Sequence, residues 1–376
     1  MAGISTKLIH DDDSTARVPD VVQPINVSTT YRYSNNPDDL VPVTQRSDEE
    51  QLSELIYSRL NHPNSVKAET ILEGILGGHV VVYSSGLAAF FAALTYYNPK
   101  TLAIGKGYHG CHGIANIFSR LNGLNQIGLD DDFSVLQKGD IVHLETPVNP
   151  EGTAFDIKYY ADKAHERGAF LTVDATFAPP PLQDPFLWGA DLVLHSATKY
   201  FGGHSDLLAG VLVTKDPKVK LQLFHDRVYL GTNIPNLESY LLNRSLRTYE
   251  LRILKQSKSA EEVVKYLNDN IAKYPVLTKV YHASLQTDAF VKEQLTGGYG
   301  PTFSIEVSEA EIAKTLPSRL KYFHHATSLG GVESLIEWRA LTDASVQPTL
   351  LRISIGIEDS KDLIEDLDQA LRFEYK

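Results

Sequence analysis

The sequence predicts an α/β protein with a large domain on a mostly parallel sheet and a smaller α+β domain after it. Short apolar runs of strand length recur between residues 80 and 213, and Ala-rich or amphipathic stretches of helix length lie between some of them. Beyond Pro275 the pattern changes to strand-like runs and a closing helix. Alternating strands and helices are typical of a parallel sheet covered on both faces, whose ligands bind beyond the carboxyl ends of the strands.

The first 50 residues predict an extended arm with loops, because they contain several prolines and few periodic apolar positions. The apolar positions from Leu52 to Leu76 predict helical turns that are interrupted near Pro63. We place the large domain at residues 51–250.

The elements of the large domain follow from its apolar runs. Residues 80–83 read as a buried strand, 84–86 as a turn and 87–97 as an Ala-rich helix. A further helix is expected at 157–167, and further strands are expected at 101–104, 141–144, 170–173, 192–194 and 210–213.

The C-terminal domain is placed at residues 251–376. The segment 236–274 contains neither Gly nor Pro, which predicts one long helix that carries the chain out of the large domain. Strands are expected at 303–307 and 350–355, and leucines four residues apart predict a helix over 359–373.

Composition excludes several classes of protein. Hydrophobic residues make up 43% and charged residues 22%, as in ordinary globular proteins, and the net charge of −12 argues against a nucleic-acid or anionic-membrane partner. Cys111 is the single cysteine, so neither a disulfide within the chain nor a Cys-rich metal site is expected, and the histidines lack the spacing of a metal site. The sequence has no apolar run long enough to span a membrane and starts without a signal-like segment, so we expect a cytoplasmic enzyme.

One lysine lies in an unusual place for packing. Lys199 follows an apolar strand within Ser196-Ala197-Thr198-Lys199-Tyr200, among hydroxyl groups and glycines. Burial lowers the pKa of an amine and makes it a nucleophile for a carbonyl group. Taken alone, an exposed lysine at a strand end would be the more frequent explanation.

Two further segments fit the same chemistry. Asp174 ends another apolar strand, where a carboxylate can hold the pyridine-nitrogen proton of pyridoxal phosphate, although alone it would read as a turn cap. Ser85 and Gly86 stand between a strand and a helix, a position whose free N–H groups bind phosphate. The three segments occur in the order that a pyridoxal-phosphate site requires.

With these segments the chain resembles the Cys/Met-metabolism family of pyridoxal-phosphate enzymes, which includes cystathionine γ-synthase, cystathionine γ- and β-lyases and methionine γ-lyase. The resemblance covers nearly the full length, and we expect the chain to be a fungal member of the trans-sulfuration type. It rests on residues 24–31, 196–206, 328–335 and 351–359. It implies the fold type I of pyridoxal-phosphate-dependent transferases and pyridoxal phosphate as cofactor.

The resemblance also assigns roles to single residues. It implies that Lys199 binds the cofactor covalently, that Asp174 holds its pyridine nitrogen and that Arg352 binds the substrate carboxylate. Tyr108 becomes the catalytic residue that stacks on the cofactor ring, with His109 as a rival. The other implied cofactor and substrate contacts are Ser85, Gly86, Leu87, Asn149, Ser196, Thr198 and Ser328, together with Tyr57 and Arg59, which would reach the cofactor of a neighbouring subunit in a homodimer or homotetramer.

Departures from the family pattern leave the reaction open. His62 and Asn64 replace an Asn and a Thr after the Tyr-Ser-Arg motif, Ala175 replaces an Asn, and Thr327 stands where several cystathionine enzymes carry Glu. We expect a carbon–sulfur lyase acting on cystathionine or a related sulfur amino acid, with γ-replacement and β-elimination as alternatives. A pyridoxal-phosphate-binding protein with little turnover is the alternative from a different class.

Overall fold

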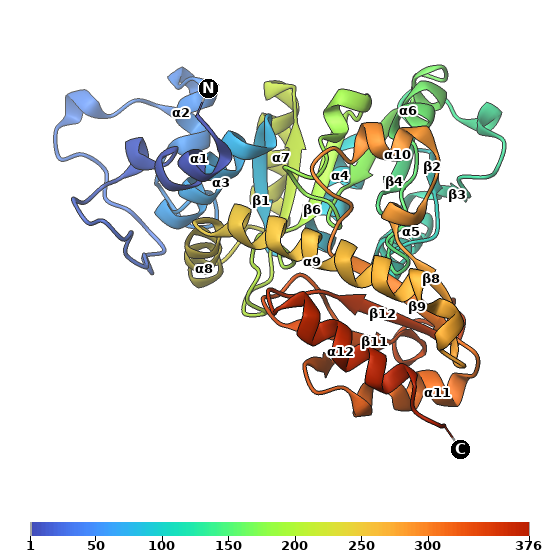
Figure 1. Cartoon of the computed structure of the whole chain (residues 1–376). Coiled ribbons are helices and arrows are strands. Elements are labelled where there is room, and N and C mark those ends of the chain that lie inside the picture. Colours follow the sequence, from blue (N-terminus) through green and yellow to red (C-terminus); the bar gives the residue numbers. More distant parts are fainter. Residues whose placement is uncertain (1, 376) are drawn as a thin grey trace.

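The computed structural model describes residues 2–375 and contains two sheets, each with its own helices (Figure 1). The seven-stranded sheet belongs to the first part of the chain and the five-stranded sheet to the last part. None of the helices in the described part of the chain is both long and apolar enough to cross a membrane.

The large sheet has the strand order β1-β7-β6-β5-β4-β2-β3. All its strands run in one direction except β7, which is antiparallel to both β1 and β6. Each strand expected between residues 80 and 213 is present, whereas the short edge strand β3 was not expected. The strands are β1 (His79–Tyr83), β2 (Thr101–Ile104), β3 (Asn125–Ile127), β4 (Ile141–Glu145), β5 (Phe170–Asp174), β6 (Leu192–Ser196) and β7 (Gly210–Thr214).

Side chains of the central strands alternate between two apolar cores, as the pleat requires. Val193 packs into one core with helices α3 (Pro63–Leu76) and α6 (Ile157–His165), whereas Leu192 and Leu194 pack into the other. The second core contains side chains of α4 (Gly86–Tyr97), α5 (His109–Asn122) and α7 (Pro217–Leu230). Both faces of the sheet are therefore covered, which leaves its edges and strand ends for binding.

The small sheet has the order β10-β11-β12-β9-β8, and only the β10–β11 pair is parallel. Helix α12 (Ser360–Leu371) covers it as expected, whereas β8, β10 and β11 were not expected. The remaining elements are β8 (Leu277–Tyr281), β9 (Thr302–Val307), β10 (Phe323–His325), β11 (Ser334–Trp338), β12 (Leu350–Ser354), α10 (Ala289–Gln294) and α11 (Ala310–Thr315).

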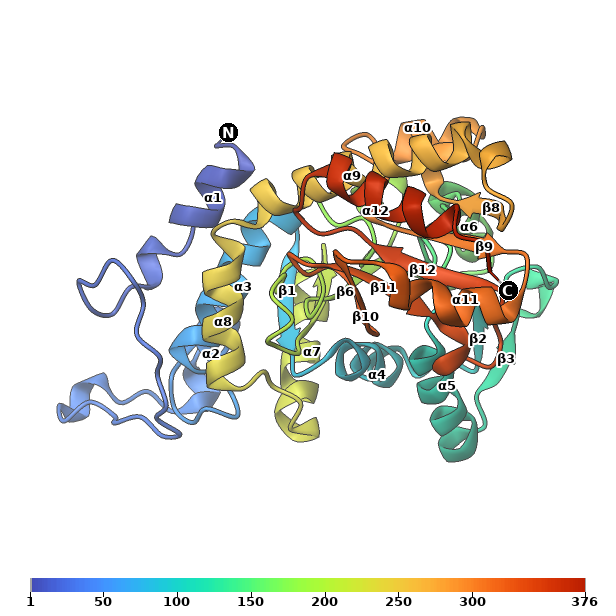
Figure 2. The same cartoon turned by 60° about the horizontal axis from the view of Figure 1, so that its bottom comes forward.

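The long helix expected over 236–274 is wrong, because the structure has two helices there, α8 (Asn236–Leu246) and α9 (Tyr249–Asp269). The chain breaks at Thr248 (φ −116°, ψ 12°), next to Arg247, whose guanidinium makes a paired ion contact at 2.7 Å with Asp12. Helix α9 starts in the core of the large sheet with Ile253 and continues into that of the small sheet with Val263 (Figure 2). The domain boundary at 250/251 stays a prediction and falls near the start of this helix.

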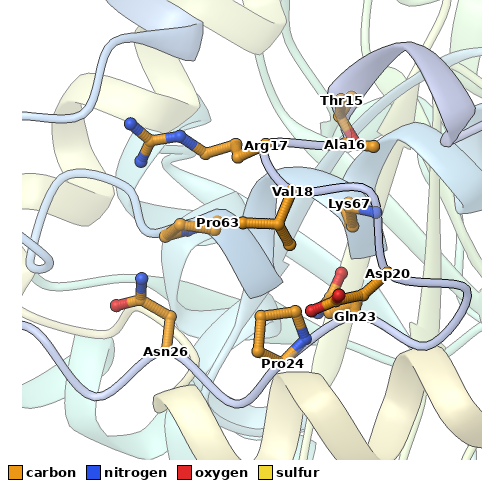
Figure 3. Close-up of a pocket in the computed structure, with 10 residues that line it drawn as sticks. All are labelled: Thr15, Ala16, Arg17, Val18, Asp20, Gln23, Pro24, Asn26, Pro63 and Lys67. Carbon is orange, nitrogen blue, oxygen red and sulfur yellow. The ribbon is translucent and has the colours of Figure 1, made fainter.

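The chain between α1 (Ile4–His10) and α3 forms an arm that projects from the body and contains the short helix α2 (Asp48–Ser53) (Figure 1). Part of the arm lies against α3 and leaves a cavity of about 290 Å³ between arm residues 15–26 and Pro63 and Lys67 (Figure 3). Many apolar side chains of the arm are exposed, among them Val21, Val22, Val27, Tyr33, Leu40 and Val43.

Candidate active site

A cavity of about 510 Å³ lies at the carboxyl ends of β4, β5 and β6, where the small sheet meets the large one. Most of the residues singled out in the sequence line it. These are Ser85, Gly86, Leu87, Tyr108, His109, Asn149, Asp174, Ser196, Thr198, Lys199, Thr327, Ser328 and Arg352. The structure thus gathers at one sheet edge residues that are up to 267 positions apart (352 − 85).

One end of the cavity is the first turn of α4, directly after β1. Ser85 is the N-cap of this helix, since its Oγ accepts a hydrogen bond from Ala88 N at 3.0 Å. The preceding N–H groups, of Gly86 and Leu87, have no carbonyl partner in the helix and are suited to an anion. Gly86 allows Ser196 to approach closely, because a Cβ at residue 86 would lie 3.1 Å from Ser196 Cβ.

Lys199 extends into the middle of the cavity and donates a hydrogen bond from Nζ to Ser328 Oγ at 2.7 Å. Burial, together with the nearby positive charge of Arg352, lowers the pKa of Lys199 to about 8. A larger fraction of this amine is neutral near neutral pH than of an exposed lysine, as its predicted role as a nucleophile requires.

Asp174 lies at the end of β5 and is held by the hydroxyl and backbone N–H of Thr176, at 2.5 and 3.0 Å from Oδ1. Burial raises its pKa to about 6, opposed by these hydrogen bonds. A cationic group at the other oxygen would restore the charged form, which suits a protonated pyridine nitrogen.

Glu145 is a site residue that the sequence reasoning missed. It pairs with Asp174 across β4 and β5, and burial, together with Asp174, raises its pKa to about 8. Its carboxyl accepts hydrogen bonds from the backbone N–H groups of Tyr108 at 2.7 Å and Asn149 at 2.6 Å. Its place at the carboxyl end of an expected strand, beside Asp174, was the signal that could have identified it.

Tyr108 and His109 both line the cavity, with ring centroids 4.9 Å apart. The Tyr108 ring lies over Gly110, where a Cβ would be 2.6 Å from its Cε1 and 2.9 Å from Leu87 Cδ2 of the first turn of α4. Both rings are therefore at the cavity, and the choice of Tyr108 over His109 as the stacking residue stays a prediction.

Arg352 lies in the cavity wall on β12 and is almost fully buried. Its guanidinium donates hydrogen bonds to Asn149 Oδ1 at 3.0 Å, the Ser328 carbonyl at 2.8 Å and Glu337 Oε2 at 2.5 Å. Arg247, another arginine that could bind a carboxylate, is instead paired with Asp12 at the N-terminal helix.

The segment that carries Ser328 is shaped by close contact with Lys199. Ser328 has a φ of +78°, a strained value for a residue with a side chain. Gly330 has a φ of +84°, and a Cβ there would lie 2.9 Å from the Lys199 carbonyl carbon. This packing joins the small sheet to the lysine and places Ser328 between Lys199 and Arg352.

Arg339 also lines the cavity and was not identified from the sequence. It is 3% exposed and contacts two carboxylates, Glu337 and Asp343, each at 3.1 Å. No sequence signal marks it, because its position depends on the fold of the short segment between β11 and β12.

Tyr57 and Arg59 do not line the cavity. Arg59 donates a hydrogen bond from Nη1 to the Val228 carbonyl at 3.0 Å, and the Tyr57 side chain is 44% exposed. Among the described residues that line the cavity, the arginines and lysines are Lys199, Arg339 and Arg352, and the latter two are engaged with carboxylates.

Two of the departures from the family pattern, His62 and Asn64, have structural explanations. His62 is the N-cap of α3, with Nδ1 accepting from Ser65 N at 3.2 Å, and Asn64 holds the arm through Asn26 N and the Pro24 carbonyl. Ala175, between Asp174 and Thr176 in the chain, is fully buried, and its replacement of an Asn has no structural explanation. Thr327, in contrast, lies exposed at the cavity, where it can affect which substrate binds.

The arrangement fits pyridoxal phosphate. The α4 turn with Ser196 and Thr198 suits the phosphate, Asp174 the pyridine nitrogen and Lys199 the aldehyde carbon. The partly neutral lysine and the aspartate are therefore complementary to a group that carries both an electrophilic carbon and a basic ring nitrogen.

Comparison with known proteins agrees with this assignment. The profile of the family described as Cys/Met metabolism PLP-dependent enzyme matches residues 5–372. The chain is 34% identical to cystathionine γ-synthase of Escherichia coli K12, over 94% of this chain and 93% of the relative. It is 31% identical to cystathionine β-lyase of Lactococcus lactis subsp. cremoris, over 100% of both chains. A solved structure of a cystathionine γ-lyase from Micromonospora echinospora superposes with a TM-score of 0.87, at 30% identity and 100% coverage of both chains.

Proposed function

The chain belongs to the Cys/Met metabolism family of PLP-dependent enzymes, and from this membership we propose that it is a carbon–sulfur lyase acting on cystathionine or a related sulfur amino acid, in the manner of a cystathionine γ-lyase. One observation carries the proposal. Ser328 joins the two groups that an amino acid would contact, because it accepts from Lys199 Nζ at 2.7 Å through Oγ and from Arg352 Nη2 at 2.8 Å through its carbonyl.

This geometry orients the bond that must break. An amino acid whose carboxylate is held by Arg352 presents its Cα–H bond beside Lys199. Pyridoxal phosphate, when bound, supplies the electron sink that makes this bond acidic. Lys199 then takes the proton from Cα, and Asp174 holds a proton at the ring nitrogen.

Elimination of a γ-thiol, elimination of a β-thiol and γ-replacement need the same groups around Cα. They differ in the protons that are moved at Cβ and in whether a second substrate enters. The relatives at about 30% identity include a β-lyase, a γ-synthase and γ-lyases. We propose γ-elimination first, and the two alternatives are outcomes of the test below.

We also propose that the active site is completed by a second copy of the chain. The phosphate-binding turn lacks a cationic side chain of its own among the described lining residues, whereas Arg59 lies outside the cavity beside Tyr57, with its guanidinium carbon 5.5 Å from the ring centroid. A dianionic phosphate is bound best by a guanidinium fork. The exposed apolar side chains of the arm would be covered in such a dimer.

The test is a steady-state assay of the holoenzyme with cystathionine, cysteine, homocysteine and O-acylhomoserines, with identification of the products. Formation of cysteine, ammonia and a 2-oxo acid from cystathionine and water is expected. Homocysteine as the product would indicate β-elimination, and turnover only with an acylhomoserine plus cysteine would indicate γ-replacement. No turnover of any substrate above a Lys199→Ala control would favour the pyridoxal-phosphate-binding protein of low turnover, which the intact Lys199, Asp174 and Arg352 oppose.

Two other expectations from the sequence remain predictions. They are that the chain is a fungal member of the family and that it is located in the cytoplasm. Subcellular fractionation of the source cells would check the location.

A further inference from the structure

A buried row of alternating charges, in the order Asp343, Arg339, Glu337, Arg352, has its two arginines in the lining of the cavity. Arg339 Nη2 lies 3.1 Å from Asp343 Oδ2, Arg339 Nη1 lies 3.1 Å from Glu337 Oε2, and the same Glu337 oxygen lies 2.5 Å from Arg352 Nη2. Each of the four side chains is at most 8% exposed. One carboxylate is therefore shared by two arginines away from bulk water.

The fold places these residues by register and by one short connection. Glu337 on β11 pairs directly with Arg352 on β12, so their side chains share a face of the small sheet. Arg339 begins the 3-10 turn that follows β11, and Asp343 lies between this turn and β12. The segment 339–349 is thereby tied to the arginine that faces the substrate.

Several contacts hold the Glu337 carboxylate in place beside Arg352. Besides the two arginines, it accepts a hydrogen bond from Thr342 Oγ1 at 2.7 Å. Arg352 in turn uses both hydrogens of Nη2, on Glu337 and the Ser328 carbonyl, and one hydrogen of Nη1, on Asn149. Nε and the second hydrogen of Nη1 have no bond among these three, and the three bonds fix the plane of the guanidinium in which both of them lie.

We infer that Glu337 and Arg339 are positioning residues, which hold the Arg352 guanidinium in the one orientation that receives a substrate carboxylate. The inference rests on the proposed role of Arg352 as the carboxylate clamp. Glu337 acts on Arg352 directly, and Arg339 acts through Glu337. Neither needs to touch the substrate.

Two possible roles of Glu337 predict opposite changes in the affinity for a substrate carboxylate when Glu337 is removed. If Glu337 were mainly a competitor of the substrate carboxylate, its removal would leave Arg352 more positive and would tighten binding. If Glu337 positions Arg352, its removal frees a long side chain beside the positive charge of Arg339 and weakens binding. The sign of the change in affinity therefore separates the two roles.

The experiment is a titration of the holoenzyme with L-methionine and with 3-(methylthio)propylamine, its analogue without the carboxylate, followed by the visible absorption of the bound cofactor. The variants are Glu337→Ala, Glu337→Gln and Arg339→Met, with Arg352→Ala as reference. Arg372→Met is the matched control, because Arg372 pairs with Asp368 on α12, outside the cavity. Because it reads binding, the titration does not depend on which sulfur compound is turned over.

We expect Glu337→Ala and Arg339→Met to bind methionine about tenfold more weakly, with the affinity for the amine unchanged. Glu337→Gln should recover most of the loss, since the amide oxygen still accepts from Arg352. Tighter or unchanged binding of methionine by Glu337→Ala and Arg339→Met would overturn the inference. If Arg352→Ala also left the preference for methionine over the amine unchanged, the clamp itself would be wrong, which would refute that part of the proposed function as well.

Discussion

Burial sets the protonation states of the side chains around the cavity, and Lys199 shows the consequence most directly. Its pKa of about 8 lies below that of an exposed lysine because the amine is mostly buried and Arg352 is close. The amine is charged below this pKa and neutral above it. Only the neutral form can attack an aldehyde.

We therefore predict that attachment of pyridoxal phosphate to the cofactor-free protein becomes faster as the pH rises toward about 8 and levels off above it. With Nα-acetyl-lysine, a model compound whose side-chain amine is exposed, the rate of reaction with pyridoxal phosphate should instead continue to rise up to about pH 10.4. Stopped-flow measurement of the visible absorption gives both profiles. A protein profile that keeps rising to the same pH as the model amine would contradict the lowered pKa.

Arg352 provides the second prediction at the residue scale. Arg352→Ala should lower kcat/KM for the best amino-acid substrate, with a loss of about 2–4 kcal/mol in transition-state stabilisation. The variant removes the carboxylate clamp and leaves Glu337 with one arginine partner fewer. Arg352→Lys should recover little, since an ammonium group lacks the planar fork. Both variants should keep the visible spectrum of the holoenzyme. Wild-type kcat/KM in Arg352→Ala would exclude this role.

The sequence predicted those site residues whose position follows from local pattern. Asp174 and Ser196 end strands with clear apolar runs, and Ser85 and Gly86 open a helix, so their place at one sheet edge follows from the α/β pattern. Glu337 and Arg339 could not be found in this way. Their roles come from contacts between β11, β12 and the short connection between them, and β11 itself was not expected.

At the scale of elements, the cap of α3 explains a departure from the family pattern. His62 replaces the usual Asn and still accepts a hydrogen bond from Ser65 N, while its Nε2 contacts the Ile234 carbonyl at 2.9 Å. Burial lowers the pKa of His62, which keeps the ring neutral and able to accept. The substitution thus preserves the start of the helix.

We predict that His62→Ala destabilises the protein by about 0.5–2 kcal/mol, the usual effect of losing an N-cap. His62→Asn should recover the cap but not the contact with Ile234, so its stability should lie between those of wild type and His62→Ala. Urea unfolding measures the differences, and the visible spectrum of each folded variant should equal that of the wild type. A lost spectrum with unchanged stability would instead make His62 part of the cofactor site.

Elements that the sequence did not predict share a physical cause. The expected continuous helix over 236–274 is interrupted at Thr248, next to Arg247, which binds Asp12, a partner 235 residues away that no local pattern reveals. Strand β10 has three residues and β8 alternates only partly, so their pairing in the small sheet, not their own sequence, defines them. In these segments, contacts with residues distant in the sequence outweigh the local secondary-structure propensity.

At the scale of the whole molecule, the arm has exposed apolar side chains and an arginine outside the cavity, whereas the α4 end of the cavity lacks an arginine among its described lining residues. The arm exposes apolar side chains and carries Arg59 and Tyr57 away from the cavity of its own chain, while the first turn of α4, proposed to bind the phosphate, has hydroxyl and N–H donors but no guanidinium. Most soluble homo-oligomers are closed and symmetric, so each arm in a dimer can serve the other cavity. Arg227 ties the segment that carries Arg59 to the large sheet of its own chain, because it donates hydrogen bonds to the Leu60 carbonyl and to the Val82 carbonyl of β1.

Complementation between two inactive variants tests the shared site. In an Arg59→Ala chain paired with a Lys199→Ala chain, one of the two sites has both groups intact, because Lys199 comes from one chain and Arg59 from the other. Random exchange in an equal mixture makes half of the dimers hybrid, so activity should recover to about a quarter of wild type. Mixing Lys199→Ala with Asp174→Asn is the control, since both groups line the cavity of the same chain and no hybrid site can contain both. Failure to recover, with subunit exchange demonstrated by native mass spectrometry, would show that Arg59 does not complete the neighbouring site.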